Sequence, residues 1–220
     1  FYLGTELAKD PNYDVYFITA DYGQADIERH ENVTVIKSLS FRQNPISGGL
    51  NVWKALKKVN ADMYMIKSIS MGLLLVSLFC RIHHKIFLYR TAHTTHCDGT
   101  YLKRHPVMGR LFRYSIKQAE MVFVQNETDR ENLKKTTGVR SNVISNGHRL
   151  NAPSQTQRKM ILWVGRSAGF KHPERFLRLA KVFPQERFVM ICQKATGDNR
   201  YESLRSKARQ IENLTFVEHV

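Results

Sequence analysis

Acidic residues are scarce in this sequence, which has 19 Asp and Glu against 34 Lys and Arg, so that its formal net charge at pH 7 is +15. A charge of this size predicts a polyanionic neighbour: a nucleic acid, an anionic membrane face or a phosphate-rich small molecule. Charge alone does not choose among the three. The apolar content of 42% excludes wholesale disorder, because it is enough to form a buried core.

Cysteine and long apolar runs are also rare. Cys80, Cys97 and Cys192 form no CxxC pair, which disfavours a disulfide framework or zinc ribbon and favours a reducing, cytoplasmic compartment. The longest apolar run, residues 71–80, is far shorter than the roughly 20 residues of a membrane-spanning helix. No stretch has the order of a signal peptide. Because the chain begins at Phe1, we expect it to be a piece of a longer protein.

Several catalytic motifs are missing as well. The sequence has no GxGxxG, no Walker phosphate loop, no G-x-S-x-G nucleophile elbow and no Asp-x-Asp metal motif. The absence of these motifs disfavours nucleophilic catalysis of the serine type and P-loop phosphoryl transfer.

Short β-branched and aromatic runs alternate with apolar residues at helical spacing. This alternation predicts a parallel sheet with right-handed crossovers and helices on both faces, a Rossmann-like α/β domain. The predicted strands are residues 14–19, 32–39, 63–69, 85–91, 121–126 and 141–147, and the predicted helices between them include 50–59, 71–82, 106–120 and 127–136.

The composition changes after Gly147. Residues 150–158 are polar and aperiodic with one proline, as in a linker. A new strand, residues 160–166, then opens another β-α-β pattern that continues to Val220. We therefore predict an N-terminal Rossmann-like domain at 1–149 without its first strand, a linker at 150–158, and the truncated start of a second domain at 159–220.

The second domain opens with the most informative segment. Its first strand brings Gly165 and Arg166 to the carboxyl end of the sheet, where open parallel sheets bind ligands. Lys171 follows after a short loop, and Pro173 is suited to the first turn of a helix. Two cations beside a helix N-terminus predict an anion site suited to a diphosphate. The alternative interpretation is that both are solvated surface cations.

The element Gly165-Arg166, four residues, then Lys171 resembles the donor-binding signature of family 4 glycosyltransferases, which have two Rossmann-like domains in a GT-B fold. Three more segments resemble that family in the same order. They are the stretch ending in His93, residues 121–133, and the Val143–Gly147 segment before the linker.

The resemblance implies that Arg166, Lys171 and Gly165 hold the diphosphate of a nucleotide-sugar and stabilise the charge that grows on the leaving group. It implies that His93 faces the sugar at the interdomain cleft, that the anomeric configuration is retained, and that neither a metal nor another cofactor is required. The acceptor is not identified, and a lipid-linked or cell-surface polysaccharide acceptor fits the family. Two family elements, a glycine-rich loop and a Glu-x7-Glu pair, are missing, so we expect this 220-residue piece to be inactive or nearly so.

His93, His96, Cys97 and Asp98 offer metal-ligand types in a tight cluster, with His105 as one more candidate nearby. A structural zinc site needs a well-placed fourth ligand and usually a distant second pair. Polar residues that follow a parallel strand need no metal, so we predict no metal site.

A basic face is predicted on the helix at 106–120. Arg110, Arg113 and Lys117 recur at i, i+3 and i+7 and therefore share one face. They are either an ordinary solvated surface or a contact for anionic lipid headgroups, each worth about 1 kcal/mol near such a surface. The second interpretation places the protein at the inner face of a membrane as a peripheral protein.

The sequence is consistent with three functions. A cytoplasmic retaining glycosyltransferase is the leading hypothesis. A nucleotide-sugar-binding protein of the same fold with another activity, such as epimerisation or phosphorolysis, is the second. A basic, non-catalytic module that docks on membrane or nucleic acid is the third. Sequence-directed nucleic-acid binding is disfavoured because the predicted sheets expose no aromatic pairs.

Overall fold

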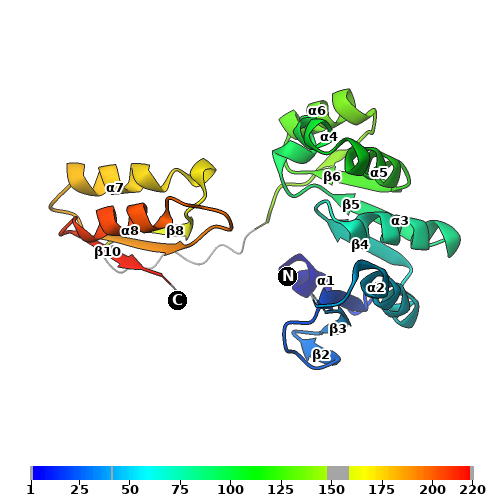
Figure 1. Ribbon diagram of the computed structural model, residues 1–220. Helices are drawn as coiled ribbons and strands as arrows, with labels where there is room; N and C mark the ends of the chain where they lie inside the picture. Colours follow the sequence, from blue (N-terminus) through cyan, green and yellow to red (C-terminus); the bar gives the residue numbers. More distant parts are fainter. Residues whose placement is uncertain (1, 41, 148–158, 219–220) are drawn as a thin grey trace. The chain divides into compact units, whose positions relative to one another are not determined.

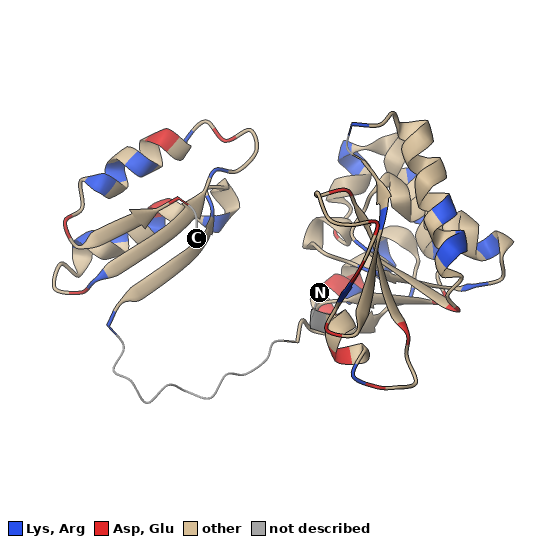
Figure 2. Ribbon diagram, turned by 90° about the horizontal axis from the view of Figure 1, so that it is seen from below, with Lys and Arg blue, Asp and Glu red and all other residues tan. Residues whose placement is uncertain are grey.

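The computed structural model describes residues 2–40, 42–147 and 159–218. The chain divides into two compact units, Phe1–Leu150 and Asn151–Val220, which we describe separately (Figure 1). The linker predicted at 150–158 lies outside the described residues. Lys and Arg occur on the helices of both units (Figure 2).

The first unit begins with helix α1 (Tyr2–Leu7) and a three-stranded sheet of order β1-β3-β2. Strands β1 (Val15–Ala20) and β3 (Val33–Leu39) are parallel, whereas β2 (Ile27–His30) is antiparallel to β3. The two turn residues, Glu31 and Asn32, have φ of 46° and 66°, the positive values that a two-residue hairpin requires. The sequence did not predict β2, which adds an antiparallel strand to the parallel pair of β1 and β3.

The rest of the first unit is a parallel four-stranded sheet of order β4-β5-β6-β7. Strand β7 has two residues, so the strand predicted at 141–147 was too long. The elements are α2 (Pro45–Val59), β4 (Met63–Lys67), α3 (Met71–Ile82), β5 (Ile86–Arg90), a 3-10 turn η1 (Thr94–His96), α4 (Thr100–Arg104), α5 (Pro106–Lys117), β6 (Met121–Val124), α6 (Glu127–Thr137) and β7 (Asn142–Val143).

Side chains fix several helix ends. Asn44 caps α2 by accepting a hydrogen bond from the backbone N–H of Ser47 at 2.9 Å. Asn126 caps α6 in the same way through the N–H of Asp129, and Gly138 ends α6 with φ of 78°. These local signals are the reason that α6 lies close to its predicted position.

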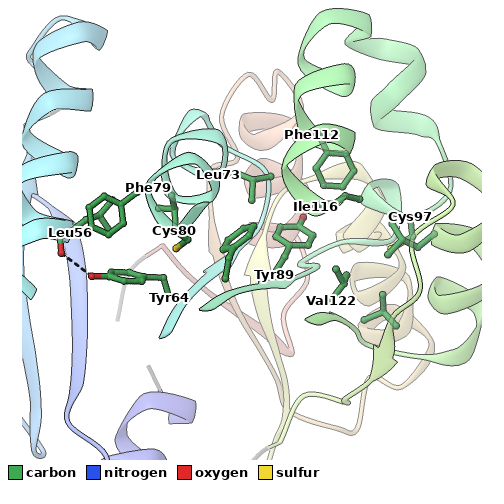
Figure 3. Close-up of a cluster of buried hydrophobic side chains, with 14 residues drawn as sticks. Leu56, Tyr64, Leu73, Phe79, Cys80, Tyr89, Cys97, Phe112, Ile116 and Val122 are labelled. Atoms are coloured by element: carbon green, nitrogen blue, oxygen red, sulfur yellow. Dashed lines mark hydrogen bonds between the residues drawn. The ribbon is translucent and has the colours of Figure 1, made fainter. Parts of the chain in front are cut away.

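One continuous core holds the four-stranded sheet to its helices (Figure 3). Phe79 of α3 packs edge-to-face on Tyr64 of β4, with ring centroids 5.4 Å apart, and Tyr89 packs likewise on Phe112 of α5. The Tyr64 hydroxyl donates a hydrogen bond to the Leu56 carbonyl at 2.8 Å, so this buried polar group ties β4 to the end of α2.

The second unit is a parallel sheet of order β10-β9-β8. Its elements are β8 (Ile161–Arg166), a 3-10 turn η2 (Gly169–Lys171), α7 (Pro173–Val182), β9 (Phe188–Gln193), α8 (Tyr201–Arg209) and β10 (Leu214–Val217). The α/β class with Rossmann-like parallel units is confirmed.

Both helices of the second unit lie on the same side of its sheet (Figures 1 and 2). Phe188, Met190 and Cys192 of β9 face these helices and are fully buried. On the other face Leu162 and Val164 of β8 are 53% and 65% exposed. The first strand of this unit, which its apolar residues predict to be buried, is covered on one face only, because among the described residues no helix of the unit lies over the other face.

Candidate functional site

Strand β8 carries the predicted anion-binding residues to the carboxyl end of its sheet. Gly165 pairs with Cys192 and Arg166 with Gln193 of the neighbouring strand. A side chain at residue 165 would meet the Trp163 ring, since a Cβ built there lies 3.0 Å from Cη2. A Cβ at residue 165 would therefore be tightly placed against the Trp163 ring, which in turn packs on the core of the unit.

The loop after β8 turns the chain into α7. The Ser167 N–H donates to the Gln193 carbonyl at 2.9 Å, and η2 brings Lys171 round before His172 adopts φ of 48°. Helix α7 begins at Pro173, as predicted. No side-chain hydrogen bond caps this end among the described residues. Pro173 has no N–H, the Arg175 N–H donates to the His172 carbonyl at 3.0 Å, and the Glu174 N–H faces its own carboxylate, so this end of α7 offers an anion the positive end of the helix dipole rather than open N–H groups.

The two predicted cations lie on either side of this loop. Arg166 and Lys171 are both exposed. The Lys171 ammonium lies 5.4 Å from the centroid of the Phe170 ring, itself 65% exposed. Within the described residues no ion pair of Arg166 or Lys171 is found, so both charges are directed to solvent, as an anion site requires.

The same helix end also carries one acid. Glu174 lies 3.4 Å from His172 through Oε1 and Nδ1. Its pKa is lowered, first by its own backbone N–H, then by His172 and Arg200. The carboxylate is therefore ionised at neutral pH and reduces the positive potential that an anion would meet.

Sequence reasoning missed two residues that reach this loop from the β9–α8 connection, Asp198 and Arg200. Arg200 lies against Gly169, because a Cβ at residue 169 would be 2.6 Å from its Nη2. Asp198 accepts a hydrogen bond from Arg200 Nε at 3.4 Å. The only sequence signal is an Asp-x-Arg pattern after Gly197, which carries no meaning without the contact across the sheet edge.

His93 belongs to the first unit and is exposed. It follows β5 by three positions rather than ending the strand, because β5 stops at Arg90. His93 caps η1: its Nδ1 accepts a hydrogen bond from the Thr95 N–H at 3.2 Å. Since Nδ1 accepts, the neutral imidazole has its proton on Nε2.

Sequence reasoning also missed Arg90, which is the last residue of β5. Its side chain is buried, and Nη2 donates to the carbonyls of Ile144 and Ser145 and to Asn146 Oδ1, the last at 2.9 Å. Asn146 Nδ2 donates in turn to Gln125 Oε1 at 2.9 Å. The Asn-Gly turn that resembles the family is therefore held by a buried arginine from β5.

The cluster after His93 does not form a metal site among the described residues, where no three His, Cys, Asp or Glu side chains come together. Burial raises the pKa of the Cys97 thiol to about 12, which keeps it protonated. Asp98 is used as a turn residue, since its Oδ1 accepts from the Thr100 N–H at 2.8 Å.

The predicted basic face is formed on α5. Arg110, Arg113 and Lys117 are exposed, while Phe112 and Ile116 are fully buried against the sheet. Arg81 of α3 extends the face, since its Nη1 donates to the Tyr114 hydroxyl at 2.8 Å. In the part of the chain that the structure describes, no helix has both the length and the apolarity to cross a bilayer.

Comparison with known proteins identifies the fold. No protein-family model matches the chain, and no curated protein matches it in sequence. Among solved structures, trehalose-6-phosphate synthase OtsA matches with a TM-score of 0.66 and 16% identity, over 100% of this chain and 68% of that one. HepE from Anabaena, in complex with UDP and glucose, matches with a TM-score of 0.61 and 15% identity, over 86% and 57%.

A third match widens the range of activities found on this fold. The UDP-GlcNAc 2-epimerase from Neisseria meningitidis, bound to UDP-GlcNAc, has a TM-score of 0.55 and 12% identity, over 94% of this chain and 72% of that one. At such identities the likeness shows the fold alone. The chain therefore has the Rossmann-like α/β fold of GT-B proteins, and its activity has to be argued from its own residues.

Proposed function

We propose that this chain binds the diphosphate of a nucleotide-sugar through its second unit. We further propose that the protein is a retaining glycosyltransferase. One observation carries the proposal: Arg166 and Lys171, both exposed, lie on either side of a loop that ends at the N-terminus of α7. A helix N-terminus flanked by two cations favours a ligand with several negative oxygens. HepE, which shares the fold, was solved with UDP and glucose.

The chemistry of these groups suits a departing diphosphate. As the bond from the anomeric carbon to the phosphate oxygen breaks, negative charge moves onto the diphosphate. The Arg166 fork, the Lys171 ammonium and the positive end of the α7 dipole stabilise that charge where it develops. For His93 we propose the role that the family resemblance implies: it lies near the donor sugar and either forms a hydrogen bond with it or stabilises positive charge at the anomeric carbon. The acceptor we propose is a lipid-linked or cell-surface glycan, which fits the basic face on α5.

Epimerisation is the second candidate, because an epimerase bound to UDP-GlcNAc shares the fold. It would use the same diphosphate contacts. The two activities differ in their product: transfer yields free nucleoside diphosphate, whereas epimerisation yields an isomeric nucleotide-sugar.

Isothermal titration of the 220-residue chain with UDP tests the diphosphate site. Arg166→Ala and Lys171→Ala should each weaken UDP binding about 10-fold or more, since a charge-assisted hydrogen bond is worth about 1.5–3 kcal/mol. Arg178→Ala and Lys181→Ala are matched controls, because both are exposed cations further along α7. Unchanged affinity in the first pair, or an equal loss in the controls, would overturn the proposal.

A further inference from the structure

Two loops of the second unit meet at the carboxyl edge of its sheet, one after β8 and one after β9. Ser167, which is 2% exposed, accepts a hydrogen bond from the Ala195 N–H through its hydroxyl oxygen at 3.0 Å. The Ser167 N–H is bonded to Gln193 on the same side. These buried bonds fix the second loop to the first, so residues of one have a defined position relative to the other.

Asp198 and Arg200 form an unequal pair in the second loop. The Asp198 side chain is 7% exposed, whereas that of Arg200 is 67% exposed. Asp198 Oδ1 accepts from the Arg200 backbone N–H at 3.0 Å and from Nε at 3.4 Å. The pKa of Asp198 is lowered, first by the Ser167 hydroxyl and then by Arg200. An ionised, buried carboxylate thus holds Arg200 by Nε and directs the two terminal nitrogens outward.

The guanidinium lies over the middle of the anion-binding loop. Its Nη2 is 2.6 Å from the position of a Cβ at Gly169, and its Nη1 is 3.4 Å from that position. Gly169 has no left-handed backbone angle that would demand glycine. The backbone therefore accepts another residue here, but any side chain at residue 169 would displace the guanidinium.

We infer that Arg200 is a third cation of the diphosphate site, held over the loop between Arg166 and Lys171 and positioned by Asp198. The inference rests on the proposed function. A nucleoside diphosphate carries several negative oxygens, and the planar fork of an arginine matches two of them at once. Asp198 is a positioning residue, since its carboxylate acts through Arg200 and does not face the ligand.

The test is titration of the 220-residue chain with UDP and, separately, with inorganic pyrophosphate. Arg200→Gln should weaken binding of both about 10-fold, as loss of a charge-assisted contact does. Gly169→Ala should weaken it several-fold without changing any charge, because the new Cβ displaces the guanidinium. Arg200→Lys should restore part of the affinity and most of its dependence on ionic strength. Lys207→Gln, an exposed cation on α8, should have no effect and serves as the control.

The outcomes separate this inference from the proposed function. If Arg166→Ala weakens UDP binding but Arg200→Gln and Gly169→Ala do not, Arg200 is no part of the site and the proposed function stands. If none of these variants changes UDP binding, both fail. Circular dichroism of each variant checks folding, and Gly169→Ala leaves the residues Asp198 and Arg200 themselves unchanged, so that a destabilised Arg200 variant still leaves a decisive measurement.

Discussion

The indole ring of Trp163 lies over the backbone of Gly165, two residues further along β8. A Cβ at residue 165 would be 3.0 Å from Cη2 and 3.2 Å from Cζ2 of that ring. Trp163 is held from the other side by Phe176 of α7, with ring centroids 6.4 Å apart. Packing of the core thus favours a glycine at the end of β8, just before the loop that leads to α7.

This relationship predicts that Gly165→Val lowers the free energy of unfolding by about 1–3 kcal/mol, the usual cost of overpacking. Gly49→Ala makes a useful contrast. Residue 49 lies inside α2, and a Cβ there would only touch Leu75 at 3.9 Å. That substitution should stabilise by about 0.5–1 kcal/mol, because alanine favours a helix interior. Urea unfolding measures both, and a neutral Gly165→Val would show that the Trp163 ring can move away.

A pH dependence is expected from His96. Its Nδ1 lies 3.4 Å from the Tyr89 hydroxyl, and its pKa is lowered below the ordinary value of 6.5, mainly by burial and then by His93. A lowered pKa means that the unfolded chain binds the proton more readily. The contribution of His96 to the free energy of unfolding is therefore fully present above pH 6.5 and is lost as the pH falls below that value.

Thermal unfolding between pH 5 and 8 tests this expectation. His96→Gln should flatten the decline of stability below pH 6.5. His84→Asn is the control, since His84 is exposed and its φ of 52° is one that asparagine tolerates. An unchanged pH profile in His96→Gln would contradict the assignment.

The basic face on α5 predicts binding to vesicles that contain phosphatidylserine. Replacing Arg110, Arg113 and Lys117 together by Gln should weaken that binding about 100-fold at low salt, at roughly 1 kcal/mol for each charge. Replacing Lys54, Lys57 and Lys58 of α2 removes the same charge from another exposed surface and should matter much less. Sedimentation with vesicles measures both, and equal losses would mean that net charge alone is responsible.

Local signals decided which elements the sequence could predict. Helix α3 lies at its predicted bounds, because its run of apolar residues is long and begins after Ser70. Strand β2 was missed because Glu28, Arg29 and His30 give it no apolar alternation, and its turn has no glycine. What defines β2 is its pairing with β3, a tertiary contact that short-range patterns do not record.

The sequence predicted those parts of the candidate site that depend on local features and missed those that depend on tertiary contacts. The loop from Arg166 to Lys171 follows from a strand, a short spacing and a proline, all of them local features. The exposure of Val164 was not predictable, since burial depends on the side to which each crossover takes its helix. Arg200 was not predictable either, because its contact with Gly169 joins two loops that only the folded sheet brings together.

Strand β2 also affects how molecules of this protein can associate with one another. It is a short edge strand with charged side chains, and such strands resist pairing with a second chain. At the opposite edge of that sheet β1 pairs, among the described strands, with β3 alone. A strand from a second molecule would therefore meet charged side chains at β2, which disfavour pairing at that edge of the sheet.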